Sequence, residues 1–481
     1  MARLPNPVRL TVLSVGLGLA RAGLIDESRA RRATDLAWPR IVTGLGRMSK
    51  NAADAAMVGV GVGPAAIAGV GFAGPYWGLT FSLGAGVAAG TIALVSQRFG
   101  AGAYDRLGGA IRSSVLLVLL VTIPLGTVFF LFPRDLISLL STDPTAIGYG
   151  TEYLRLIALG VPFAALNLIG SRALIGADDA WTPMVVRAGS ATANIVLDAA
   201  FIFGLEMGVT GAALATVLAN VGATAAFAVG IARGGLPLVG SFPLSVDPRG
   251  SYLDRGTLRD IVTIGLPVMG RTTTWTAARF PMLAIIDIYG STVVAAYVIA
   301  RRIWGLMNTP GWGFGLAASS LVGQELGAGD ERAAESYGRE MVRFAVATYA
   351  VFAVIVALLA RPVVIAFVGD PGSPEVPIAV GLVYAACLAV LGQGVGRTMA
   401  GALDATGDTR WPFYSQALGL FAGSIPLAYL GATTPLGLWG LYLAFFTETM
   451  VPAAVNYYRF ATGKWKAISR EYRPETPMGD D

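Results

Sequence analysis

Four polar side chains in the first half of the chain have the types needed to hold a proton or a small cation. Asn194 and Asp198 are four residues apart, so on a helix they share one face. Asp54 lies in an earlier apolar segment, and Thr216 lies in the segment that follows. Two carboxylates away from water can retain a proton, or can bind a small hard cation together with amide and hydroxyl oxygens. The alternative interpretation is structural: Asn194 and Thr216 hydrogen-bond between helices, and Asp54 caps its helix.

These side chains lie in segments that are long and apolar enough to cross a membrane. Of the 481 residues, 54% are hydrophobic and 14% are charged, and the mean hydropathy is +0.63. Soluble proteins of this length have far fewer apolar residues. A helix needs about 20 residues to cross roughly 30 Å of hydrocarbon. We therefore expect an all-α membrane protein of twelve spans, at 36–62, 65–93, 109–132, 147–171, 181–204, 209–232, 260–289, 291–318, 340–368, 377–402, 412–431 and 436–459.

The second half of the chain repeats the first. Val95-Ser-Gln-Arg-Phe-Gly-Ala-Gly102 returns as Val322-Gly-Gln-Glu-Leu-Gly-Ala-Gly329, 227 residues later (from 95 to 322). A duplication of this kind in an apolar chain is typical of transporters built from two bundles related by an axis along the membrane normal. The expected parts are an N-terminal segment at 1–35, an N-lobe at 36–232, a linker at 233–259, a C-lobe at 260–460 and a tail at 461–481.

Basic residues gather on one side of the predicted membrane. Residues 1–40 contain seven arginines, and the C-terminal tail adds basic residues such as Lys464, Lys466 and Arg470, whereas the loops on the other side hold little more than Arg134 and Arg361. Loops rich in Lys and Arg stay in the cytoplasm, so both termini are expected there, with the protein in the cell membrane. The apolar run at 8–20 is too short to span and predicts an interfacial helix, with a secretion signal as the alternative.

Several motifs carry a resemblance to a known family. They are Asp54-Ala-Ala-Met-Val-Gly59, Gly63-Pro-Ala-Ala-Ile-Ala68, both Gln-x-x-Gly-Ala-Gly loops, Asn194-Ile-Val-Leu-Asp198 and Gly208-Val-Thr-Gly-Ala-Ala-Leu-Ala-Thr216. Over about 36–460 the chain resembles the multidrug and toxic compound extrusion (MATE) transporters, in the branch similar to the prokaryotic DNA-damage-inducible protein F. The loop at 102–112 is similar to a signature of major facilitator transporters, but its counterpart in the second half lacks that pattern.

The resemblance implies twelve transmembrane helices in two pseudo-symmetric six-helix bundles. The implied function is multidrug efflux of organic compounds, cationic or amphipathic, in antiport with H⁺ or Na⁺ by rocking-bundle alternating access. It assigns the coupling site to Asp54, Asp198, Asn194 and Thr216, where Na⁺ is also possible, together with Tyr153. It further implies that the first span bends at Pro39, although a proline can also simply begin a helix. The implied partners are small-molecule substrates and the lipid bilayer, with the protein working as a monomer and without a cofactor.

One residue near the predicted site departs from the family pattern. Lys50 lies four residues before Asp54, within ion-pair reach on the same helix face. We interpret Lys50 as a built-in counter-ion, which would make a bound sodium ion less necessary there.

The acidic site is not repeated in the second half. The positions that answer Asn194 and Asp198 are Gly423 and Leu427, and the positions where relatives carry C-lobe acids correspond to Trp275 and Gln393. Arginines are present instead and would permit an anionic or zwitterionic substrate, unless they reach an interface or pair locally. These arginines and the acids without an assigned role are Arg271, Arg279, Arg301, Arg302, Asp287, Asp404 and Glu448.

The composition excludes several other kinds of function. There is no histidine, and Cys387 is the single cysteine, so histidine catalysis, histidine-ligated metals and intrachain disulfides are excluded and an enzyme is not expected. The basic residues form no sustained stripe, so nucleic acid is not an expected partner. The alternative that stays open is a flippase or an exporter of an anionic or lipid-linked substrate in the same superfamily.

Overall fold

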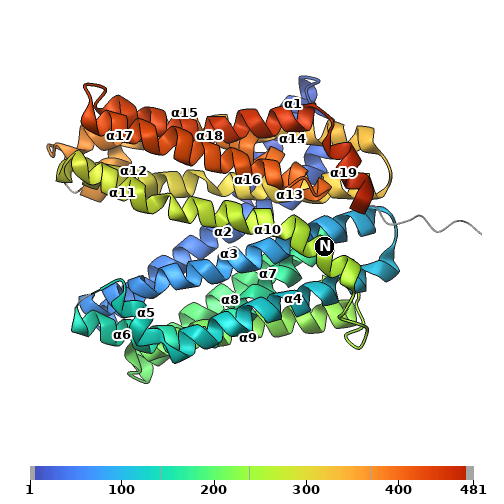
Figure 1. Ribbon diagram of the computed structural model, residues 1–481, viewed down its shortest axis with the longest axis horizontal. Coiled ribbons are helices and arrows are strands. Elements are labelled where there is room, and N and C mark those ends of the chain that lie inside the picture. Colours follow the sequence, from blue (N-terminus) through green and yellow to red (C-terminus); the bar gives the residue numbers. More distant parts are fainter. Residues whose placement is uncertain (1–5, 142, 238, 369, 473–481) are drawn as a thin grey trace, which may run out of the picture. The chain divides into compact units, whose positions relative to one another are not determined.

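The computed structural model describes residues 6–472, apart from 142, 238 and 369, and nearly all of them are helical (Figure 1). The elements in chain order are α1 (Pro7–Arg21), α2 (Glu27–Gly61), α3 (Pro64–Gly100), α4 (Tyr104–Leu131), α5 (Pro133–Ser138), α6 (Pro144–Ala158), α7 (Val161–Gly176), α8 (Trp181–Ala199), the π-helix η1 (Ala200–Gly204), α9 (Gly208–Arg233), β1 (Gly235–Leu236), β2 (Gly240–Ser241), α10 (Arg255–Ala277), α11 (Arg279–Ile288), α12 (Ser291–Met307), α13 (Thr309–Gly327), α14 (Glu331–Val368), α15 (Glu375–Thr406), α16 (Arg410–Ala417), the π-helix η2 (Leu418–Ser424), α17 (Ile425–Thr433), α18 (Leu438–Ala461) and α19 (Trp465–Tyr472). The two strands pair antiparallel as a short hairpin.

Helical segments occupy the positions of all the expected spans. Seven helices of the described chain are each long and apolar enough to cross a membrane, or eight if α6 and α7 count as one span bent by 50°. The other expected spans are divided between consecutive shorter helices, such as α12 with α13, or contain several charges, as α2 does.

Prolines account for two of the divisions within expected spans. Pro162 stands in the first turn of α7, and Pro310 stands in the first turn of α13. Proline has no N–H to donate, but its fixed φ suits the first turn of a helix. The expected spans at 147–171 and 291–318 are therefore each divided between two helices, because each proline begins a new helix.

The chain forms two compact units, one of residues 42–269 and one of residues 1–41 with 270–481. Helices α2 and α10 each contribute residues to both units. These limits differ from the lobes expected at 36–232 and 260–460, which stay predictions. The first five residues of the expected N-terminal segment, and the expected tail beyond Tyr472, lie outside the described residues.

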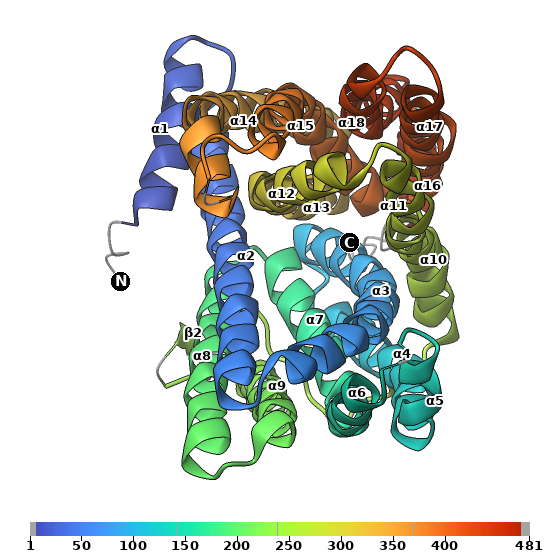
Figure 2. The same ribbon diagram turned by 90° about the vertical axis from the view of Figure 1, so that its left-hand side faces the viewer.

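In the unit of residues 42–269, α3 packs against α4, α6 and α7, and α8 packs against α9 (Figure 2). Glycine allows the closest of these approaches. A Cβ on Gly69 of α3 would lie 2.7 Å from both the carbonyl oxygen of Ala146 and the amide nitrogen of Gly150 on α6. The spacing of α3 and α6 therefore depends on the missing side chain at 69.

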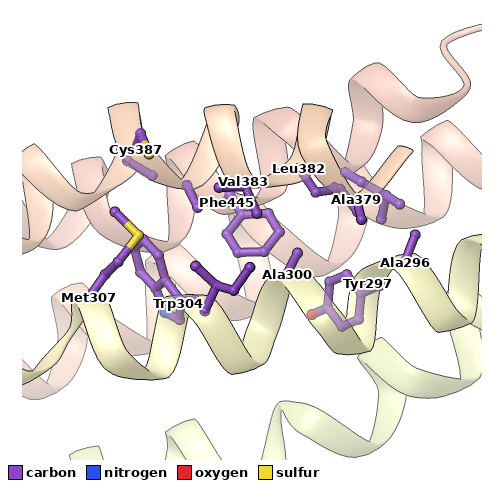
Figure 3. Packing of buried hydrophobic residues seen from close by; sticks show 14 of the residues in the cluster. Ala296, Tyr297, Ala300, Trp304, Met307, Ala379, Leu382, Val383, Cys387 and Phe445 are labelled. Carbon is purple, nitrogen blue, oxygen red and sulfur yellow. The ribbon is translucent and has the colours of Figure 1, made fainter. Parts of the chain in front are cut away.

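In the other unit, α15 packs against α12, α13, α14 and α18. Residues of α12, α15 and α18 meet in an apolar core (Figure 3). Phe445 of α18 lies between two aromatic side chains of α12, with ring centroids 5.7 Å from Trp304 and 5.9 Å from Tyr297. Cys387 is buried in the same cluster. Burial of this kind stabilises by about 25 cal/mol per Å² of apolar surface and holds these rings in fixed positions.

Residues 6–41 pack against helices of the second half. Helix α1, at the place of the expected interfacial helix, packs against α14 (Figure 2). Arg29 at the start of α2 forms an ion pair of 2.5 Å with Glu340 of α14. At the other end of the chain, Lys466 and Arg470 of α19 form ion pairs of 2.7 Å with Glu335 and Glu331 of α14. Both terminal segments are thus attached to the N-terminal part of α14.

Candidate functional site

Four helices of the unit of residues 42–269 bring the predicted coupling residues together. Asp54 is on α2, Tyr153 on α6, Asn194 and Asp198 on α8, and Thr216 on α9. The Nδ2 atom of Asn194 donates a hydrogen bond of 3.3 Å to Oγ1 of Thr216. The two carboxylates interact with each other, and the Tyr153 phenol interacts with both of them and with Thr216. All five side chains therefore belong to one site.

The most unusual group in this site is the carboxylate of Asp198. Asp198 and Asn194 are both fully buried. Both carboxylate oxygens of Asp198, Oδ1 of Asn194 and Oδ1 of Asp54 accept no hydrogen bond from the described part of the chain. A buried acceptor without a donor costs about 1–3 kcal/mol, and a buried charge without a partner costs more. The site therefore offers a cluster of oxygen atoms that a proton or a small cation would satisfy.

Lys50 is the counter-ion of Asp54. Its Nζ atom forms an ion pair with Oδ2 of Asp54 one helical turn later, and the two side chains are 19% and 23% exposed. Lys50 also interacts electrostatically with Asp198. With both carboxylates ionised, the site carries one negative charge instead of two.

An apolar cluster beside the site holds α2 against η1 and α9. Val58 packs with Ile202 and Val209 in this cluster. At Gly61, near the end of α2, a Cβ would lie 2.5 Å from Cγ2 of Ile202, so a larger residue would push the two elements apart. The π-helix η1 follows Asp198 almost directly, and single π turns are frequent at functional sites. Neither feature was predicted from the sequence, because both depend on tertiary packing.

A chain of polar side chains continues from the site along α9, and sequence reasoning missed it. Asn220 donates a hydrogen bond of 2.8 Å to the backbone carbonyl of Thr216, and Asn167 of α7 donates one of 3.0 Å to Oδ1 of Asn220. Thr224 in turn donates a hydrogen bond of 2.9 Å to Oδ1 of Asn167. The available signal was the spacing of four residues between Thr216, Asn220 and Thr224, which places all three on one helix face.

Pro39 lies inside a helix and does not begin one. Helix α2 begins at Glu27, twelve residues before Pro39 (from 27 to 39), and continues to Gly61. An interior proline removes one helical hydrogen bond and permits a bend. The interpretation in which Pro39 begins its helix is therefore wrong, and a bend at Pro39 stays a prediction.

A second candidate site is a cavity of about 370 Å³ within residues 270–481. Its lining residues include Trp275, Arg279, Tyr297, Arg301, Arg302, Trp304, Asn308 and Glu448. Arg301 donates two hydrogen bonds to the Glu448 carboxylate, of 3.1 and 2.6 Å, and one of 2.7 Å to the Tyr297 hydroxyl. Arg279 places its guanidinium 4.1 Å from the ring centroid of Trp275.

Two of the three acids of the second half that had no assigned role have partners. Arg271 donates hydrogen bonds of 3.2 and 2.7 Å to Asp404, and Glu448 is paired with Arg301. The third acid, Asp287, lies exposed near the end of α11. These ion pairs join residues more than 130 positions apart, so no local pattern identifies them.

In the second half, the position that answers Asn194 is tightly packed. Gly423, which answers Asn194, lies in η2, where a Cβ would be 3.0 Å from Cβ of Thr447. Trp275 and Gln393 stand where relatives carry acids in the C-lobe. The Trp275 ring stacks on Arg279, and Gln393 donates a hydrogen bond of 2.5 Å to Oδ1 of Asn308. The two units therefore carry different polar groups.

Comparison with known proteins locates both halves in one family pattern. The MatE family model matches residues 39–200 and again residues 268–430, which agrees with the internal repeat. The chain is 27% identical over 433 residues to a probable multidrug resistance protein NorM of Bradyrhizobium diazoefficiens, covering 88% of this chain and 91% of that protein. It is 28% identical over 443 residues to the multidrug resistance protein PmpM of Pseudomonas aeruginosa, covering 89% and 90%.

Solved structures show the same fold. The chain is similar to an outward-facing multidrug resistance MATE family transporter, with a TM-score of 0.81, 23% identity and coverage of 92% of this chain and 96% of that one. It is also similar to a transporter of the same superfamily from Pyrococcus furiosus whose binding pocket is described as having reversed polarity, with a TM-score of 0.80, 23% identity and coverage of 91% and 96%. These likenesses confirm the all-α fold of twelve transmembrane helices.

Proposed function

This chain belongs to the MatE family, and from that premise we propose that it is a multidrug efflux transporter driven by antiport with protons. It is a multi-pass membrane protein with small-molecule substrates, and it is a transporter rather than an enzyme. The two relatives named above are both multidrug resistance proteins, which supports export of organic compounds.

The observation that carries the coupling proposal is the state of Asp198. Its carboxylate is fully buried, has no hydrogen-bond donor within the described residues and faces the second carboxylate, that of Asp54. A proton shared between two such carboxylates removes one charge and supplies one donor. Each entry and departure of the proton would change the charge at the junction of α2, α6, α8 and α9, and a charge change of this kind is what couples an ion gradient to a conformational change.

Lys50 favours the proton over sodium. A sodium ion at Asp54, Asn194, Asp198 and Thr216 would have carboxylate, amide and hydroxyl oxygens as ligands, a suitable set for a hard cation. It would also lie beside the Lys50 ammonium, which already neutralises Asp54. A proton on Asp198 avoids this repulsion, because the neutral acid leaves the Lys50–Asp54 pair intact.

The mechanism that we infer is alternating access by rocking of the two bundles, with α2 bending at Pro39 when the acidic site is protonated. One proton moving down roughly 150 mV releases about 3.4 kcal/mol, at about 2.3 kcal/mol per 100 mV. Since 1.4 kcal/mol corresponds to a factor of ten, this sustains a gradient of roughly 300-fold for a neutral solute.

Several properties complete the proposal. The protein resides in the cell membrane with both termini in the cytoplasm, works as a monomer and needs no cofactor beyond the coupling ion. Its assignment to the branch similar to DNA-damage-inducible protein F also stays a prediction.

The test is counterflow of fluorescent organic compounds, one cationic and one anionic, in proteoliposomes under an imposed pH gradient or an imposed sodium gradient. We expect accumulation under the pH gradient, and loss of that accumulation in Asp198→Asn. The variant should still exchange drug between the two sides without a gradient, because the substitution removes the proton carrier and not the substrate pathway. Asp287→Asn, at an exposed position of the other unit, is the matched control and should behave like wild type.

Two results would contradict the proposal. Drug accumulation that follows the sodium gradient alone would replace the proton by sodium as the coupling ion. Unchanged pH-driven accumulation in Asp198→Asn would remove this carboxylate from the coupling mechanism.

A further inference from the structure

We propose that the cavity within residues 270–481 binds an organic anion, namely an aromatic or otherwise flat apolar compound that carries one carboxylate. This inference rests on the proposed function, because it names the class of compound that the exporter takes at this cavity. It differs from the expectation of a cationic substrate derived from the family resemblance.

The charges that line the cavity are predominantly positive. Three of the lining side chains are arginines, Arg279, Arg301 and Arg302, and a single lining side chain, that of Glu448, is acidic. With all four ionised, the lining carries a net charge of two positive units. Such a lining attracts an anion and disfavours a cation, because unit charges about 4 Å apart interact by several times the thermal energy at the effective dielectric constant of about 20 found near a protein surface.

Glu448 offers little free charge to a cationic ligand, because it is already paired. Its side chain is only 4% exposed, and both of its oxygens accept hydrogen bonds from Arg301. Arg301 is further held by the Tyr297 hydroxyl and by the Phe445 ring, whose centroid is 4.6 Å from its guanidinium carbon. A paired Glu448 therefore neutralises one arginine and leaves two.

Arg279 is the group that we assign to the ligand carboxylate. It forms no ion pair with any acid in the described part of the chain, and its side chain is exposed. Its guanidinium lies 4.1 Å from the centroid of the Trp275 ring, which holds its plane in place without using its hydrogen-bond donors. A guanidinium fixed in this way is prepared to donate two parallel hydrogen bonds to a carboxylate.

The apolar part of the ligand follows from the walls. Trp275, Tyr297 and Trp304 line the cavity together with Met282 and Leu283. Tyr297 and Trp304 are buried and pack against Phe445, as Figure 3 shows, so this wall is rigid. The volume of about 370 Å³ lies within the range of about 300–1,000 Å³ that is typical of small-molecule sites.

Binding can be measured directly on the full chain in lipid nanodiscs by isothermal titration calorimetry. The probes are 2-naphthoxyacetate, its uncharged methyl ester and the cationic 2-naphthylmethylammonium, which share one aromatic body. We expect the carboxylate to bind at least tenfold more tightly than either of the other two. Arg279→Gln should lower the affinity for the carboxylate by about tenfold to a hundredfold and leave the affinity for the ester unchanged, since a hydrogen bond to a charged group contributes that much. The matched control is Arg361→Gln, an exposed arginine of the same unit that does not line the cavity.

A second variant is expected to change the affinity in the opposite direction. Glu448→Gln releases Arg301 from its ion pair and should raise the affinity for the carboxylate severalfold. In a purely apolar cavity, neither variant would change the affinity. Equal affinities for the three probes, or a preference for the cation, would overturn the inference. These titrations need no ion gradient. If the titrations show no preference for the carboxylate but pH-driven export is intact in the proteoliposomes, the anion site is refuted and the proposed function is not. If the titrations show the preference but pH-driven export is absent, the proposed function is refuted and the anion site is not.

Discussion

Replacing Gly69 with alanine should push α6 away from α3 and weaken the fold around the coupling site. The new Cβ would lie 2.7 Å from the carbonyl oxygen of Ala146 and from the amide nitrogen of Gly150, and 2.8 Å from Cβ of Tyr149. Ordinary contact begins near 3.4 Å, and none of these atoms can rotate away, so α6 must move by several tenths of an ångström. Overpacking of this kind costs about 1–3 kcal/mol. Tyr153 lies one turn further along α6 and moves with it.

The measurement is thermal unfolding of the purified protein in nanodiscs, followed by pH-driven transport. A loss of 1 kcal/mol lowers the midpoint by roughly 2–4 °C in a cooperative unit of 150–250 residues, so a decrease of several degrees is expected. Gly71→Ala is the control, because it is exposed on the same helix and has no atom within 4 Å of its new Cβ. That variant should match wild type or gain slightly from the helix preference of alanine. Equal midpoints for the two variants would refute the close-packing argument.

Three further predictions concern charged groups. Lys50→Gln should allow a sodium gradient to drive export, because it removes the repulsion between the Lys50 ammonium and a bound sodium ion. Two like charges 4 Å apart repel by about 4 kcal/mol at an effective dielectric constant of 20. Counterflow in proteoliposomes measures this response, and no response to the sodium gradient would contradict the counter-ion role of Lys50. The Thr257 hydroxyl and backbone amides at the start of α10 hold the pKa of Asp254 below its usual 3.8, so its stabilisation is present above about pH 4 and is lost as the pH falls through the lowered pKa. Asp254→Ala should cost about 1 kcal/mol at neutral pH, and melting curves of the two proteins should converge in acid. Arg301→Met leaves the Glu448 carboxylate buried and unpaired and should lower the free energy of unfolding by about 3–5 kcal/mol. Adding Glu448→Met should recover most of this loss. A double variant as unstable as the single one would show that the unpaired carboxylate is not the cause.

The architecture was predictable because membrane insertion and duplication both leave periodic signals in the sequence. Apolar runs of a fixed length predicted twelve spans, and helical segments lie at each of their positions. The repeated loops at 95–102 and 322–329 indicated that the halves correspond. The breaks inside spans were missed, although Pro162 and Pro310 marked two of them. The mean hydropathy of a window changes little with one residue, whereas a single proline is enough to divide a helix.

The coupling residues were partly predictable for the same reason. Asn194 and Asp198 share a helix face through local spacing, and Lys50 stands one turn from Asp54. Which helix packs beside α8 is a tertiary property, and only the family resemblance supplied Tyr153. The pairing of Arg301 with Glu448, 147 positions later in the chain, has no local signal at all.

The close approach of Gly423 to Thr447 has a consequence for how this transporter can evolve. A gene duplication first produces two equal halves. An asparagine introduced at 423 would now bring its Cβ to 3.0 Å from Cβ of Thr447, so Thr447 would have to move by a few tenths of an ångström. Packing therefore adds a cost to any substitution that makes the halves equal again at this position, whatever the selection on function.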